Sequence, residues 1–227
     1  TAEIVPDLDV IARACATAGA ELLVDAYHHL NVVPFDVSSM GLADAFVTGG
    51  GYKYCQLGEG NAFLRVPPGR RMRPVLTGWF AERAALEERP TGSVRYGPGA
   101  AALAGATYDP TSHYRAAAVF RFHAQHGLTP ERLRDISRRQ VRRLESRVDA
   151  LRIDDRVLRI EPMPDQRRAG FLALRTSRAA ELARALRTRD VFVDARGDIL
   201  RLGPAPYLDD RQLDDGVAAL GELLCAL

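Results

Sequence analysis

The chain has 227 residues, of which 47% are hydrophobic and 26% are charged, and its formal net charge is +2. This composition supports one large hydrophobic core or two smaller ones and argues against intrinsic disorder. The near balance of charge gives no indication of a nucleic-acid partner. The longest apolar runs fall short of the ~20 residues that a membrane span requires, and no signal peptide opens the chain, so we expect neither.

The cysteines are three in number and far apart in the sequence: Cys15, Cys55 and Cys225. An odd, scattered set argues against a disulfide framework and favours a reducing compartment, so we expect a cytoplasmic protein. Cys55 could be a nucleophile, but no histidine is near it in sequence, and a small buried side chain is the favoured interpretation. The spacing of cysteines, histidines and carboxylates resembles no metal site.

The first half of the chain has the order of elements that is typical of an α/β fold. A loop over residues 1–9 leads into a helix that begins at Pro6 and Asp7 and ends at Gly19. A strand over residues 21–25 follows, and the order helix then strand repeats at 37–42 and 45–48. Another strand is expected at 62–66. This order is typical of a mostly parallel sheet.

Residues 70–105 lose this periodicity, which is typical of a functional segment or an interface, and they include the only tryptophan, Trp79. The run 108–111 then caps a helix that extends to about residue 126. Thr129 and Pro130 have the pattern of an N-cap and first turn for a helix rich in arginine between residues 132 and 147. The arginines indicate a solvated helix face, with a basic docking surface as the alternative.

Beyond residue 151 the pattern changes to α+β. The expected strands are 156–160, 170–175, 191–194 and 199–202, and the expected helices are 178–187 and 209–225.

Lys53 is the only lysine among 31 lysine and arginine residues. An amine can lose its proton and act as a nucleophile or form a Schiff base, whereas a guanidinium stays protonated. Lys53 follows a predicted strand and three glycines, Gly49, Gly50 and Gly51, where α/β sheets place their ligands. It is therefore a candidate for covalent chemistry, with a leftover surface lysine as the alternative.

Asp25 ends the strand over residues 21–25, so an acid and the Lys53 amine are expected to meet at one edge of the sheet. Pyridoxal phosphate requires such a pair, because the amine forms an imine with its aldehyde and the acid keeps its ring nitrogen protonated. Because the strand is apolar, we expect Asp25 to be buried, with a helix cap or a surface acid as the alternative.

Four runs occur in an order that resembles the kynureninase group of class V, fold type I pyridoxal phosphate enzymes: 23–28, 51–54, 76–80 and 200–207. The likeness covers nearly the whole chain but only the C-terminal part of the family's sequence. It implies that residues 1–115 are part of the large cofactor-binding domain and residues 116–227 the small C-terminal domain. It also implies a homodimer with a shared active site.

The resemblance implies a role for several residues. Lys53 would hold the cofactor as a Schiff base and move the Cα proton, Asp25 would contact the pyridinium nitrogen, and His28 would line the cofactor. Tyr52 would contact the phosphate and serve in proton transfer. An ordinary packing role remains the alternative for His28 and Tyr52.

Trp79 matches a tryptophan that reaches the phosphate across the dimer interface, and Arg201 matches the arginine that binds the substrate α-carboxylate. Core packing is the alternative for Trp79. Asp109 falls where kynureninases carry asparagine or a nearby threonine close to the cofactor phosphate. Its charge would oppose a dianion unless it points elsewhere or pairs with an arginine. Thr107 could replace it as a donor there.

The resemblance predicts a hydrolase of tryptophan catabolism that cleaves kynurenine or 3-hydroxykynurenine into an anthranilate and alanine. Two alternatives stay open. One is another class V enzyme on the same scaffold, such as an aminotransferase or a tailoring enzyme. The other is a non-catalytic truncated relative that serves as a binding or dimerisation module.

Overall fold

The structure is a computed structural model that describes residues 3–87 and 92–225. Residues 1–2 of the expected N-terminal loop and residues 88–91 of the expected non-periodic stretch lie outside this part. The chain divides into two compact units. We call residues 7–27 and 36–122 the sheet unit, and residues 1–6, 28–35 and 123–227 the C-terminal unit.

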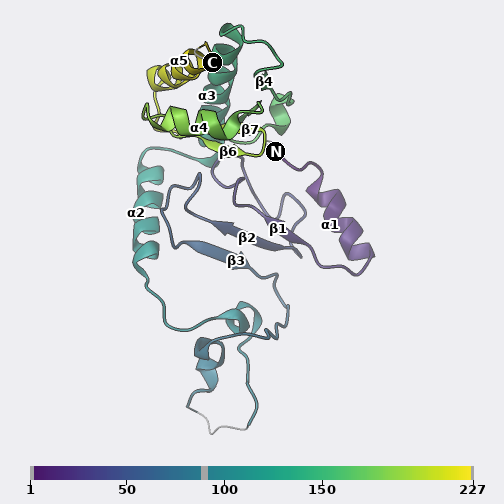
Figure 1. The fold of residues 1–227 in the computed structure, drawn as a ribbon. Helices are drawn as coiled ribbons and strands as arrows, with labels where there is room; N and C mark the ends of the chain where they lie inside the picture. Colours follow the sequence, from purple (N-terminus) through teal and green to yellow (C-terminus); the bar gives the residue numbers. More distant parts are fainter. Residues whose placement is uncertain (1–2, 88–91, 226–227) are drawn as a thin grey trace. The chain divides into compact units, whose positions relative to one another are not determined.

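The sheet unit holds a small mixed sheet (Figure 1). Its elements are α1 (Leu8–Thr17), β1 (Leu23–Asp25), β2 (Phe46–Gly50), β3 (Ala62–Arg65), the 3-10 helices Trp79–Ala85 and Gly99–Leu103, and most of α2 (Thr111–Gln125). The strand order is β1-β2-β3, with β1 parallel and β3 antiparallel to β2. An antiparallel strand beside parallel ones is common in α/β folds.

The central strand β2 is apolar and well covered, with Phe46 and Val47 buried. Its last two residues, Gly49 and Gly50, pair with β3 and so belong to the strand, not to the following turn. The sequence pattern thus located the strand correctly but ended it two residues early.

The helix expected at residues 37–42 is wrong, because this segment is a run of turns. The Asp36 carboxylate accepts a hydrogen bond from the Ser39 N–H at 2.6 Å, which stabilises a single turn. Gly41 then adopts a left-handed φ of 66°, a conformation that ends a helical path. Leu42 is fully buried directly after it.

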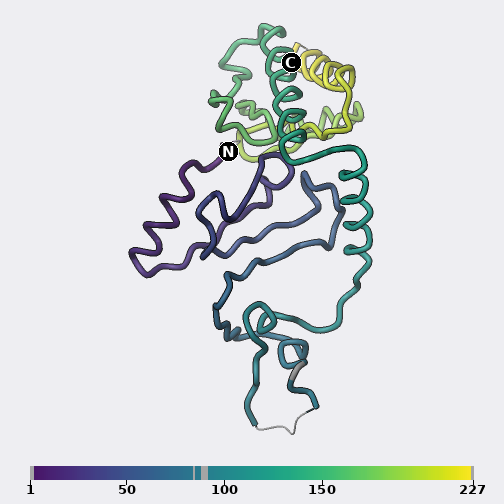
Figure 2. Tube along the Cα trace, turned by 180° about the vertical axis from the view of Figure 1, so that it is seen from behind, coloured from purple at the N-terminus to yellow at the C-terminus, as the bar shows by residue number. Residues whose placement is uncertain are grey.

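The C-terminal unit is an antiparallel sheet covered by helices. Its elements are α3 (Pro130–Ala150), β4 (Arg159–Ile160), the 3-10 helix Asp165–Arg167, β5 (Leu172–Arg175), α4 (Ala179–Arg187), β6 (Asp194–Arg196), β7 (Ile199–Leu202) and α5 (Asp210–Cys225). The strand order is β4-β5-β7-β6. Helices α3 and α5 lie side by side, as the view from behind shows (Figure 2).

The alternation of side chains in β5 and β7 separates the two faces of this sheet. Leu172, Leu174 and Leu200 are fully buried in the core with α3, α4 and α5. Arg201, between Leu200 and Leu202, therefore lies on the opposite face, where its guanidinium carbon is 5.2 Å from the centroid of the Phe171 ring.

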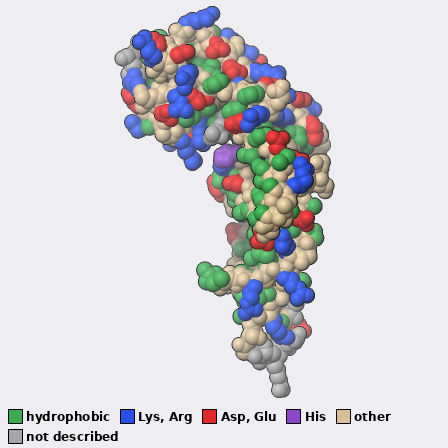
Figure 3. All heavy atoms as spheres, turned by 90° about the vertical axis from the view of Figure 1, so that its right-hand side faces the viewer, with side chains coloured by type: hydrophobic (Ala, Val, Ile, Leu, Met, Phe, Trp, Pro, Cys, Tyr) green, Lys and Arg blue, Asp and Glu red, His purple; other side chains and the backbone are tan. Residues whose placement is uncertain are grey.

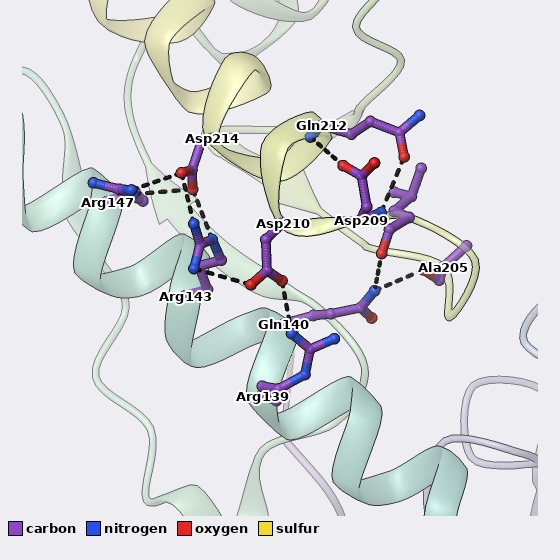
Figure 4. Close-up of polar contacts among 10 residues, drawn as sticks. Arg139, Gln140, Arg143, Arg147, Ala205, Asp209, Asp210, Gln212 and Asp214 are labelled. Atoms are coloured by element: carbon purple, nitrogen blue, oxygen red, sulfur yellow. Dashed lines mark hydrogen bonds and ion pairs between the residues drawn. The ribbon is translucent and has the colours of Figure 1, made fainter.

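Five arginines of α3 are paired with acidic side chains inside the unit. Arg143 and Arg147 both donate to Asp214 of α5, and Arg139 donates to Asp210 (Figure 4). Arg138 and Arg142 donate to Asp165. Acidic and basic side chains are accordingly interspersed on the surface of this unit (Figure 3). The face is partly solvated, as expected, but these ion pairs bind α3 to its neighbours and compensate part of its charge.

The three cysteines are free thiols, and Cys55 is buried as expected. Within the part of the chain that the structure describes, no helix combines the length and apolar character needed to cross a membrane.

Candidate active site

Lys53 lies in a closed turn directly after β2. The Gly51 N–H donates to the Asn61 carbonyl at 2.6 Å, the Leu57 N–H donates to the Gly51 carbonyl at 2.7 Å, and the Gln56 N–H donates to the Lys53 carbonyl at 3.0 Å. Lys53 itself is half-buried. The amine is thus carried by a turn whose two ends are hydrogen-bonded to each other.

The two glycines that enter this turn have no room for a side chain. A Cβ on Gly50 would lie 2.3 Å from the Tyr27 ring, and a Cβ on Gly51 would lie 2.5 Å from the Leu57 side chain. Real Cβ atoms do not approach so closely, so glycine is required for Tyr27 and Leu57 to pack against the backbone here. The glycine run therefore serves close packing around the lysine.

Two tyrosines flank the Lys53 amine. Its Nζ lies 5.9 Å from the centroid of the Tyr27 ring and 5.6 Å from that of Tyr52, and the two rings are 5.7 Å apart. Both distances are within the range of a cation–π interaction. Tyr27 was missed as a site residue, although it lies in the run 23–28. No local pattern indicated Tyr27, because its packing on Gly50 is a tertiary contact.

Asp25 precedes Tyr27 by two residues at the end of β1. Its Oδ1 accepts a hydrogen bond from the Tyr27 N–H at 2.9 Å, and its backbone pairs with Thr48 of β2. The prediction that Asp25 is buried is wrong, because Asp25 is exposed. The reason is that Asp25 shares an uncovered face of the edge strand β1 with Leu23, which is 59% exposed.

Asp109 is engaged at the start of α2. Its Oδ1 accepts hydrogen bonds from the Thr111 hydroxyl at 2.6 Å and from the Thr111 N–H at 2.9 Å. These two bonds lower the pKa of the Asp109 carboxyl from its ordinary value. The carboxylate thus stabilises the first turn of α2, as the sequence pattern predicted for this run.

Trp79 begins the 3-10 helix Trp79–Ala85 and is 47% exposed. Its ring packs on Phe80 with centroids 4.1 Å apart, and the Arg83 guanidinium carbon lies 6.0 Å from its centroid. Gly78 precedes it with no space for a Cβ, which would lie 2.4 Å from the Gly105 carbonyl carbon. The tryptophan is therefore held at a surface position by the backbone of residues 105–106.

Two further predicted site residues belong to the C-terminal unit. His28 is exposed in the segment 28–35. Arg201 of β7 has a largely buried side chain, whose Nη1 donates to Asp194 Oδ2 at 3.3 Å. Within the described residues, the buried Arg201 Nε has no hydrogen-bond acceptor. This guanidinium therefore keeps capacity for another anionic or carbonyl partner.

Cys55 does not provide a nucleophile in this structure. Burial raises the pKa of its thiol, which disfavours the reactive thiolate. In the sheet unit, the structure places the Lys53 amine beside the Tyr27 and Tyr52 rings, and the Asp25 carboxylate accepts a hydrogen bond from the Tyr27 N–H. An amine can bond an aldehyde carbon, and an exposed carboxylate can pair with a cationic ring nitrogen, so this set fits a pyridine aldehyde cofactor.

Comparison with known families identifies one domain. Residues 133–220 match the family model of the kynureninase C-terminal domain. This segment runs from the first turn of α3 to the last part of α5. No curated protein sequence matches the chain.

Solved structures with the same fold are numerous. They include a cysteine desulfurase from Thermococcus onnurineus NA1, with a TM-score of 0.78, 16% identity and coverage of 96% of this chain and 56% of that chain. The cysteine desulfurase CsdA from Escherichia coli has a TM-score of 0.74 and 17% identity, with coverage of 98% and 56%. Ureidoglycine-glyoxylate aminotransferase from Bacillus subtilis has a TM-score of 0.72 and 18% identity, with coverage of 100% and 58%.

At these identities the likeness establishes the fold and not the activity. The chain spans 56–59% of the length of the solved structures it matches.

Proposed function

We propose that this chain belongs to a hydrolase that cleaves kynurenine or 3-hydroxykynurenine into an anthranilate and alanine. The chain is the kynureninase-like C-terminal part of a class V, fold type I pyridoxal phosphate enzyme. The observation that carries this proposal is the match of residues 133–220 to the kynureninase C-terminal domain. The fold of the remaining residues agrees with it.

Pyridoxal phosphate, when bound, withdraws the electrons that remain on the substrate Cα after proton loss. In the proposed site Lys53 would hold the cofactor through its aldehyde group, and Asp25 would keep the ring nitrogen protonated. The exposed position of Asp25 leaves its second carboxylate oxygen accessible to a ligand, because the Tyr27 N–H binds Oδ1. A pyridinium cation would then compensate the charge of the acid.

Lys53 is also the proposed base for the Cα proton. The rings of Tyr27 and Tyr52 lie on its flanks and restrict the directions in which the amine can point. The Tyr52 hydroxyl is the proposed partner of the phosphate and a proton carrier, since Tyr52 is 45% exposed and can reach a ligand. His28 and Trp79 are proposed cofactor contacts, and Asp109 or Thr107 is proposed to lie near the phosphate.

Arg201 is the proposed partner of the substrate α-carboxylate. Its guanidinium is partly buried against Phe171, and one of its five donors is directed at Asp194. A planar fork with remaining donors suits two-point binding of a carboxylate. Arg201→Lys should therefore raise KM for the amino acid more than it lowers kcat, because a lysine cannot provide the fork.

The test is product analysis with the complete native protein, pyridoxal phosphate and kynurenine. We expect an anthranilate and alanine in equal amounts, and loss of at least about 100-fold in turnover for Lys53→Arg, which keeps the charge but cannot bond an aldehyde. Borohydride should attach the cofactor to the peptide that contains Lys53.

Other outcomes would redirect the proposal. Formation of a keto acid without anthranilate would favour an aminotransferase, the activity named for one of the structural neighbours. A colourless protein that ignores added pyridoxal phosphate would favour a non-catalytic relative.

We also propose a homodimer in the cytoplasm. The dimer follows from the family resemblance and agrees with the extreme exposure of Val75 at 98% and Leu76 at 89%, which lie just before Trp79. Apolar side chains exposed to this extent in neighbouring positions are typical of interfaces. Three free thiols fit a reducing compartment.

A further inference from the structure

The loop that follows Lys53 has an unusual backbone. Gln56, Gly58 and Gly60 have φ values of 57°, 71° and 84°, all in the left-handed region. A residue other than glycine rarely adopts this conformation, and it persists only where the surrounding structure holds it. Gln56 is the one of these three residues that is not glycine, so its conformation indicates that contacts hold this loop.

The first two turns of α2 provide these contacts. The Arg115 side chain donates from Nε to the Leu57 carbonyl at 2.5 Å and from Nη2 to the Glu59 carbonyl. The Ser112 hydroxyl donates to the Gly60 carbonyl at 2.9 Å, and Asn61 Nδ2 lies 3.3 Å from His113 Nδ1. The loop is thus bound along its length by one helix that comes much later in the chain.

Arg115 is specifically suited to this contact. Its planar guanidinium directs two donors at two carbonyls at once, which the single ammonium of a lysine cannot do in a fixed geometry. A Cβ on Gly58 would lie 2.7 Å from the Arg115 Cζ, so the guanidinium occupies the space over the Gly58 backbone. The arginine and the glycine are therefore matched in shape.

Leu57 connects Arg115 to the Lys53 turn. Its carbonyl accepts from Arg115, while its N–H donates to Gly51 and its side chain packs over the Gly51 backbone. Leu57 is only 3% exposed. Lys53 lies within the turn that the Leu57 N–H closes on the Gly51 carbonyl, so we expect a displacement of Leu57 to alter the turn that carries the amine.

We propose that Arg115 is a positioning residue for Lys53, and that α2 directs the amine through Leu57. This inference rests on the proposed function, in which Lys53 bonds pyridoxal phosphate. Arg115 itself is not proposed to contact the cofactor or the substrate.

The test compares Arg115→Ala and Arg115→Lys with Arg121→Ala, an exposed arginine on the same helix. In Arg115→Ala we expect the Gly51 and Leu57 amides to exchange hydrogen about tenfold faster, because their turn opens locally. Borohydride attachment of pyridoxal phosphate to Lys53 should slow by a similar factor. Arg115→Lys should lie between Arg115→Ala and wild type, and Arg121→Ala should match wild type.

The outcomes separate the two proposals. Unchanged exchange in Arg115→Ala, or faster exchange with normal attachment at Lys53, would overturn the positioning role and leave the proposed function intact. Failure of the wild-type protein to attach the cofactor at Lys53 would overturn the proposed function and this inference with it. If Arg115→Ala does not fold, Arg115→Lys decides by the same two measurements.

Discussion

At the scale of single residues, Gly50 shows how closely the site is packed. Gly50→Ala places a methyl group 2.3 Å from the Tyr27 ring, so the ring must move away from the strand. Overpacking of this kind costs about 1–3 kcal/mol of unfolding free energy. Denaturant titration should show this loss, whereas Gly105→Ala, with open space at its Cβ, should change the stability little.

The double variant Tyr27→Ala with Gly50→Ala tests whether the Tyr27 ring causes this loss of stability. If the ring is responsible, Gly50→Ala should cost much less in the Tyr27→Ala background than alone, because the colliding atoms are gone. Equal costs in both backgrounds would show that the loss comes from the backbone of β2.

At the scale of elements, the start of α3 depends on one side chain. The Thr129 hydroxyl accepts a hydrogen bond from the Arg132 N–H at 3.3 Å, and Pro130 occupies the first turn. Thr129→Ala should reduce the unfolding free energy of the C-terminal unit by about 1 kcal/mol, whereas Thr129→Ser should retain most of it. Equal stability of the alanine and serine variants in chemical denaturation would contradict the capping role.

The junction of α3 and α5 should depend on pH. Hydrogen bonds from Arg143 and then from Arg147 hold the pKa of the Asp214 carboxyl well below its ordinary value of 3.8. A carboxyl with a lowered native pKa stabilises the fold at pH values above its unfolded pKa, and this contribution is lost as the pH falls through the native pKa.

Asp214→Asn should therefore lower the Tm by a few degrees at pH 7, and the difference from wild type should shrink as the pH falls below about 4. Asp215→Asn, on the same helix and 69% exposed at the side chain, is the control and should change the Tm little at either pH. A difference between wild type and Asp214→Asn that stays constant from pH 7 down to strongly acidic conditions would contradict the assignment.

At the scale of the whole molecule, the proposed homodimer makes the surface before Trp79 an interface. Leu76→Glu introduces a charge at a side chain that is 89% exposed, so it should leave the folded chain stable. If Leu76 is buried between subunits, the charge should shift the dimer towards monomer in sedimentation experiments. Val157→Glu, at a side chain 41% exposed in the C-terminal unit, is the control. A monomeric wild-type protein would contradict the dimer itself.

The sequence predicted most elements because their signals are local. Caps and periodicity located α2 and α5, and the start of α3, to within a residue or two. The error at residues 37–42 arose because the left-handed conformation of Gly41 depends on what surrounds it. The strand expected at 191–194 lies at Asp194–Arg196 instead, because the Val191 N–H donates to the Leu186 carbonyl and so closes the end of α4.

The sequence by itself determined the fold class and the order of most elements, and it singled out Lys53 as the one lysine. Composition and short-range patterns carry that information. Only the tertiary structure decided that Asp25 is exposed, that Tyr27 packs on Gly50, and that Arg115 binds the loop after Lys53. These depend on contacts between residues far apart in the chain, which no local pattern encodes.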